Sequence, residues 1–161
     1  LIESLSATAS MLASVEPGKV PGELDSMTEH YRLWRREPHF GQLLRSAEAL
    51  QARLGDSAGI LERALAPAKG CPMDRGAVAF YRKHYLEGLA PRIQQIRGYG
   101  RRMARTLETL AEATGASPPD AMIPFIKRNL RTRHAASVWS DLDQAVARHA
   151  RAWNRLLARC D

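Results

Sequence analysis

The stretch VAFYRKHYLEGLAPRIQQIRGYGRRMARTLETL, residues 78–110, decides the fold of this chain. Its apolar and small residues recur at steps of three and four: Val78, Tyr81, Tyr85, Leu89, Ile93, Ile96, Gly100, Met103, Leu107 and Leu110. This spacing keeps one side of an α-helix apolar, so the stretch predicts a long helix that packs against a partner helix. Because Pro91 removes an internal hydrogen bond, we expect it to kink or divide this helix.

The same spacing recurs near the end of the chain and predicts a last helix over residues 139–160. Its apolar seam consists of Trp139, Leu142, Val146, His149, Trp153, Leu156 and Cys160. Another apolar stripe predicts a helix over residues 40–54, which we expect Gly55-Asp56-Ser57 to end, and shorter helices precede it. No segment alternates with the period of a β-strand. We therefore predict an all-α fold, an antiparallel helical bundle with two long amphipathic helices and several shorter N-terminal helices.

Length and composition suit a single domain, which we assign to residues 1–161 of this 17.9 kDa chain. A hydrophobic content of 45% with 25% charged residues excludes a disordered chain. No apolar run approaches the roughly 20 residues that span a bilayer, so we expect no membrane partner. The chain opens LIESLSATASML, without an initiator Met or a signal-peptide pattern. We expect a piece of a larger protein, in which residues 1–22 form either part of the bundle or a linker helix.

Cysteine and histidine usage gives no sign of a metal site. Two cysteines, Cys71 and Cys160, are too few for a disulfide framework, so we expect reduced thiols and a cytoplasmic location. His149 lies on the seam of the last helix, where a hydrogen-bonded core histidine is favoured over a metal ligand. The sequence contains no HxxxH pair, P-loop or paired-carboxylate motif. We therefore expect neither a metal nor a cofactor.

The net charge of +7 is unevenly distributed along the chain. Residues 1–80 carry nine basic and ten acidic residues, whereas residues 81–161 carry fifteen basic and seven acidic residues. Twenty of the 24 basic residues are arginine, which pairs bidentately with phosphate or carboxylate groups. Helical spacing places many of the arginines in rows away from the apolar seams. The predicted polyanion-binding residues are Arg97, Arg101, Arg102, Arg105, Lys127, Arg128, Arg131, Arg133, Arg148, Arg151, Arg155 and Arg159.

These rows predict a non-catalytic helical interaction module, with nucleic acid as the leading partner and an acidic protein surface as the other. Two further explanations stay open: a solvated helix face whose charges suit the helix dipole, and a structural or dimerising bundle. No zinc finger, RNP motif or KH-type GxxG loop is present, so we expect binding to be directed at the phosphate backbone and to depend on salt. The oligomeric state and the choice between DNA and RNA stay open.

One catalytic pattern provides the alternative function. The run RNLRTRH, residues 128–134, resembles the R-polar-x4-H signature of HEPN ribonucleases, which are all-α domains. The resemblance implies metal-independent RNA cleavage, with His134 in acid–base chemistry, Arg128 stabilising charge on the phosphate and Asn129 as the polar residue. On a regular helix Arg128 and His134 point about 120° apart, so a shared site requires irregular backbone or a second subunit.

Overall fold

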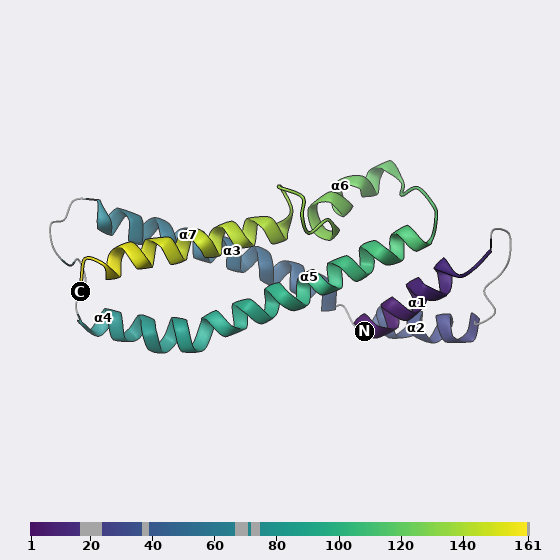
Figure 1. The fold of residues 1–161 in the computed structure, drawn as a ribbon, viewed down its shortest axis with the longest axis horizontal. Coiled ribbons are helices and arrows are strands. Elements are labelled where there is room, and N and C mark those ends of the chain that lie inside the picture. The colour runs from purple at the N-terminus through teal and green to yellow at the C-terminus, as the bar shows by residue number, and fades with distance from the viewer. Residues whose placement is uncertain (17–23, 37–38, 67–70, 72–74, 161) are drawn as a thin grey trace.

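The chain folds into a bundle of helices, without strands among the residues that the structure describes (Figure 1). The structure is a computed structural model that describes residues 1–16, 24–36, 39–66, 71 and 75–160. Three long stretches of helix form the body of the bundle, and a pair of shorter N-terminal helices packs at one end. The all-α prediction is confirmed.

The longest stretch of helix is continuous and has three parts: α4 (Arg75–Phe80), the π-helical segment η1 (Tyr81–Leu89) and α5 (Ala90–Ala113). At the end of η1 the backbone N–H of Ala90 donates to the carbonyl of Tyr85, five residues back. Pro91 lies in the first turn of α5, where a missing N–H is tolerated. The change from π-helical to α-helical geometry therefore falls where Pro91 predicts a division.

The helix α3 (His39–Leu65) runs beside α7 (Val138–Leu157), and this is the most extensive helix pairing of the bundle. The predicted end of this helix at Gly55-Asp56-Ser57 is wrong. An internal glycine costs a helix about 1 kcal/mol. That cost is outweighed because the apolar stripe continues past it, and Ala58, Leu61 and Leu65 are buried. Full burial of each leucine side chain contributes about 1.5–3 kcal/mol.

Cross-helix contacts give the directions of the three long helices. Glu62 and Leu65 of α3 contact, in ascending order, Arg148 of α7 and Arg159 of the turn that follows α7, so these two helices are parallel. The long helix is antiparallel to α7, because Tyr81 stacks on Trp153 near one end and Arg97 contacts Asp143 further along. This up-down-up arrangement is typical of an antiparallel bundle with three long helices.

The main core lies where these three helices meet, around Trp139 of α7. A methyl group added to Gly100 of α5 would lie 2.2 Å from the Trp139 ring. The glycine therefore lets α5 approach the tryptophan closely. The indole Nε1 of Trp139 donates to the backbone carbonyl of Asn129 at 2.9 Å, which leaves this buried polar group satisfied.

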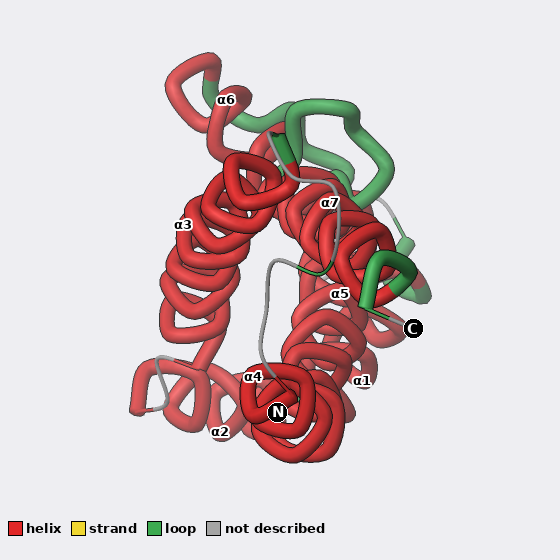
Figure 2. Tube along the Cα trace, turned by 90° about the vertical axis from the view of Figure 1, so that its left-hand side faces the viewer, coloured by secondary structure: helices red, strands yellow, loops and turns green. Residues whose placement is uncertain are grey.

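The N-terminal helices α1 (Ile2–Ala13) and α2 (Leu24–Arg36) form a pair that packs chiefly through α1 against α5 (Figure 2). Side-chain hydrogen bonds join the pair: Thr8 Oγ1 lies 2.8 Å from His30 Nδ1, and Trp34 Nε1 donates to Ser4 Oγ at 2.7 Å. Ser26 Oγ also donates to Met11 Sδ at 3.7 Å. In Figure 1 the pair lies beside the C-terminal half of α5, far from the C-terminus of the chain.

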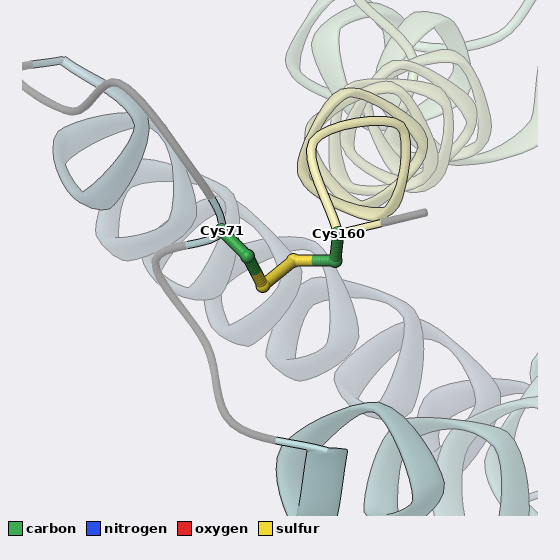
Figure 3. Close-up of a disulfide and its surroundings, with 2 residues drawn as sticks. All are labelled: Cys71 and Cys160. Carbon is green, nitrogen blue, oxygen red and sulfur yellow. A yellow bond between two sulfur atoms is a disulfide. The ribbon is translucent and has the colours of Figure 1, made fainter.

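The two cysteines are joined in a disulfide between Cys71, in the connection from α3 to α4, and Cys160, just after α7 (Figure 3). The expectation of reduced thiols is therefore wrong. The two residues are 89 positions apart, so no local spacing motif marks the pair in the sequence. The disulfide ties the connection between two long helices to the end of the third. Within the described ranges, no helix has the length and apolar character needed to cross a membrane.

Candidate anion-binding surface

Four arginines form what we call the arginine row of α7: Arg148, Arg151 and Arg155 in the helix and Arg159 in the turn after it. Arg148 donates through Nε and Nη2 to the carboxylate of Glu62 at 3.1 and 2.5 Å, and Arg155 Nη2 lies 3.7 Å from the same carboxylate. The hydrogen bond from Arg148 lowers the pKa of Glu62. Arg159 donates to the backbone carbonyl of Leu65 at 2.8 Å. Three of the four arginines in this row thus join α7 to α3.

The arginine row of α5 is also partly engaged within the fold. Arg97 Nε and Nη2 lie 2.8 and 2.6 Å from Asp143 Oδ1 on α7, and Arg101 Nη2 contacts Oδ2 of the same carboxylate. One aspartate therefore holds two guanidinium groups between α5 and α7. This leaves Arg102 and Arg105, both exposed, as the members of the row for which no ion pair occurs within the described part of the chain.

The residues of the ribonuclease-like run occupy separate positions. The run begins in the π-helical turn η3 (Ile126–Leu130), which follows η2 (Asp120–Met122) and α6 (Ile123–Phe125). Arg128 Nη1 donates to the carbonyl of Ala136 at 2.8 Å and contacts Asp141 of α7, whereas Asn129 is buried. Both residues thus hold η3 against the start of α7. His134 lies beyond them, in the exposed segment that leads to α7.

A cavity of about 490 Å³ gathers three of the predicted cations, Arg105, Arg131 and Arg133. It is lined by Arg105, Glu108, Arg131, Thr132, Arg133 and His134. Glu108 Oε1 lies 3.4 Å from Arg131 Nε, and it is the one carboxylate in this lining. Three guanidinium groups from α5 and from the segment after η3 therefore surround one cavity. We call these six residues the arginine pocket.

The backbone fixes the position of residues 131–134 from both sides. The N–H of Arg131 donates to the carbonyl of Ile126 at 3.0 Å, which ends η3. The N–H of His134 then donates to the carbonyl of Arg131 at 3.0 Å, which closes a turn. Ser137 caps α7, because its hydroxyl accepts from the N–H of Ser140 at 3.1 Å. The arginine pocket is thus built on a short connection held between two helical ends.

Arg102 and Arg105 also line a groove of about 720 Å³ between α5 and α1. Arg102 lies over the Tyr99 ring, with its guanidinium carbon 5.9 Å from the ring centroid. The remaining predicted cations, Lys127 and Arg151, are exposed and lie outside the arginine pocket. The structure thus brings together three of the twelve predicted cations, Arg105, Arg131 and Arg133, in the arginine pocket, and Arg102 lies beside Arg105 in the adjoining groove.

The structure places His149 as a buried core residue. Its Nε2 accepts a hydrogen bond from Trp153 Nε1 at 3.1 Å, and its ring centroid lies 4.6 Å from that of Tyr85 in η1. Its Nδ1 has no hydrogen-bond partner among the described residues. Burial lowers the pKa of His149. No group of three or more His, Cys, Asp or Glu side chains in the described ranges is arranged to hold a metal ion.

The sequence profile of a family described as "Protein of unknown function (DUF3080)" matches residues 1–161. The chain belongs to the DUF3080 family. No curated protein and no solved structure matches the chain. We therefore infer the function of this DUF3080 chain from the residues on its surface.

Two members of the arginine pocket were missing from the predicted site. Glu108 follows Arg105 by three residues, which places both side chains on one helix face, so helical spacing alone indicates this pair. Thr132 stands between two predicted arginines in the run RTR, at the corner of the turn that the structure shows. In this DUF3080 chain spacing thus indicates Glu108, whereas Thr132 is recognised only once the segment after η3 is placed against α5.

Proposed function

We propose that this DUF3080 domain is a non-catalytic interaction module that binds an anionic partner through Arg102, Arg105, Arg131 and Arg133. The single observation that carries the proposal is the convergence of three of these arginines on one cavity lined by a single carboxylate. Arginine forms bidentate, charge-assisted hydrogen bonds with phosphate and carboxylate groups, so such a cluster favours an anionic ligand. Nucleic acid is the leading partner class, and an acidic protein surface is the other.

The internal ion pairs reduce the number of cations that this surface offers. Each protein cation that neutralises a phosphate of B-DNA contributes about −0.9 to the slope of log K against log salt concentration. The four cations of the proposed surface, one of which, Arg131, also pairs with Glu108, give a slope of at most about −3.6, whereas all twelve cations predicted from the sequence would give about −11. The slope measures how many cations contact the nucleic acid, independently of its sequence.

Fluorescence anisotropy with labelled duplex DNA, single-stranded RNA and an acidic peptide, each across a salt series, tests the proposal. We expect binding that weakens with salt, with a slope near −3.6 for duplex DNA. The double variant Arg105→Gln/Arg133→Gln should lose most of this binding. Arg151→Gln is the matched control, because Arg151 is an exposed arginine outside the arginine pocket. The proposal would be overturned if none of the three ligands bound at low salt. It would also be overturned if the Arg105→Gln/Arg133→Gln variant bound as well as the Arg151→Gln control.

The compartment in which the domain works is also part of the proposal. Disulfides persist in oxidising compartments and are rare in the cytoplasm. The Cys71–Cys160 disulfide therefore weighs against the cytoplasmic location predicted from the cysteine count, and we propose an oxidising compartment. Thiol alkylation of the protein in intact cells, before and after reduction, distinguishes the two. Cysteines that react with the alkylating reagent before reduction would show that the thiols are free in the cell, and this result would support the cytoplasmic location.

The HEPN-like ribonuclease stays a prediction with its own test. His134 lines the arginine pocket, whereas Arg128 is engaged with Ala136 and Asp141 and does not line it. Incubation of the purified chain with RNA in EDTA decides the matter. Cleavage that His134→Ala abolishes would establish the activity, and RNA that stays intact would remove it.

A further inference from the structure

The charge of the arginine pocket matches a dianion. Arg105, Arg131 and Arg133 contribute three positive charges, and Glu108 contributes one negative charge. The arginines and the glutamate of the lining therefore sum to a formal charge of +2. A phosphate monoester carries about −1.5 to −2 near pH 7. A carboxylate and a backbone phosphodiester each carry a single negative charge, so either would leave part of the lining charge unbalanced.

The hydrogen-bonding groups of the pocket also suit a phosphate group with several acceptor oxygens. His134 Nδ1 accepts from the backbone N–H of Ala136 at 3.3 Å, so in the neutral ring Nε2 carries the hydrogen and is a donor. Glu108 holds Arg131 by its Nε and leaves the two Nη groups of that guanidinium as donors. The Thr132 hydroxyl adds another donor. A terminal phosphate presents three oxygens that accept such bonds.

The shape of the site favours one discrete group over a length of polymer. Sites for small ligands have volumes of about 300–1,000 Å³, and the arginine pocket, at about 490 Å³, falls within this range. A continuous nucleic-acid backbone is bound along an extended row of cations. In the arginine row of α7, which would be such an extended row, three of the four arginines contact Glu62 or Leu65 of α3.

We propose that the arginine pocket binds a phosphate monoester, the terminal phosphate of the anionic partner. This inference rests on the proposed anion binding and specifies the group that is recognised. Arg131 and Arg133, from the turn after η3, and Arg105, from α5, approach the phosphate from two sides of the cavity. The arginine pocket would then recognise a chain end or a phosphorylated side chain, in addition to the salt-dependent contacts proposed above.

A pair of oligonucleotides of one sequence, labelled at the 3′ end and carrying either a 5′-phosphate or a 5′-hydroxyl, tests this inference by anisotropy. We expect about tenfold tighter binding of the phosphorylated form, because charge-assisted hydrogen bonds contribute free energy on the scale of a tenfold change in affinity. Inorganic phosphate should compete with it. Arg133→Gln should abolish the preference, and Arg151→Gln should retain it. Circular dichroism of both variants verifies that they fold.

The outcomes separate this inference from the broader proposal. Equal affinity for the two oligonucleotides, with binding that still depends on Arg105 and Arg133, overturns the terminal phosphate and leaves anion binding in place. Failure to bind either form, together with failure to bind a phosphoserine peptide or inorganic phosphate, overturns both. A second pair of ligands, a peptide with and without phosphoserine, identifies the source of the phosphate. Binding of the phosphopeptide alone supports the phosphate site and replaces nucleic acid with a phosphorylated protein.

Discussion

Reduction of the Cys71–Cys160 disulfide should lower the free energy of unfolding by about 4.6 kcal/mol. The disulfide joins residues 89 positions apart, so it restricts a large part of the unfolded chain. In the chain-entropy relation, closing a loop of this length removes about 15.5 cal/mol/K from the unfolded state, which gives about 4.6 kcal/mol at 25 °C. Domains have unfolding free energies of about 5–15 kcal/mol, so this one bond accounts for a large share of the stability.

Urea unfolding followed by tryptophan fluorescence measures this effect. With an m-value of about 2 kcal/mol/M, the urea midpoint should fall by roughly 2 M on reduction. The double variant Cys71→Ser/Cys160→Ser should unfold at the midpoint of the reduced protein and should not respond to reductant. Equal midpoints for the oxidised and reduced protein, with both thiols shown to be free after reduction, would refute the reasoning from loop length.

Three other substitutions and conditions test the packing described above. Gly100→Ala should lower the free energy of unfolding by about 1–3 kcal/mol because the new methyl group overlaps the Trp139 ring. Gly98→Ala meets only ordinary contacts and should raise the free energy of unfolding by up to about 1 kcal/mol. Equal effects of the two substitutions in urea unfolding would contradict the close approach of α5 to Trp139. Ser137→Ala should cost about 1 kcal/mol through loss of the cap of α7, and an unchanged urea midpoint would argue against that cap. Burial lowers the pKa of His149 in the folded protein, whereas in the unfolded chain this group becomes protonated below about pH 6.5. The free energy of unfolding should therefore decline as the pH falls from 7.5 to 5. His149→Gln should flatten this dependence, as measured by urea unfolding at each pH.

Much of the fold follows from apolar spacing alone. The steps of three and four in residues 78–110 predict the long helix, and the same steps place Trp139 and Leu142 in the core where α7 meets it. The prediction of a helix end at Gly55-Asp56-Ser57 was wrong because it rested on local residue preference, whereas the apolar spacing continues through these residues. Burial of Ala58 and Leu61 against another part of the chain overrides that preference.

The candidate site was predictable only in part, because the partners of its arginines lie far away in the sequence. Helical spacing reveals pairs three or four residues apart, whereas Asp143 lies 46 and 42 positions from the two arginines that it contacts. Glu62 lies 86 positions from Arg148. The sequence therefore identifies which residues are cationic and on which helix face they lie, but packing between helices determines which of them have a carboxylate partner.

Asp143 and Glu62 each hold two guanidinium groups, and this sharing bears on how the surface of the protein can change in evolution. Replacing either acid with a neutral residue would leave two cations without their anion in a single step. Very few mutations can thus change the number of unpaired cations on the surface of the bundle. The leucine and tryptophan contacts between its helices stay as they are.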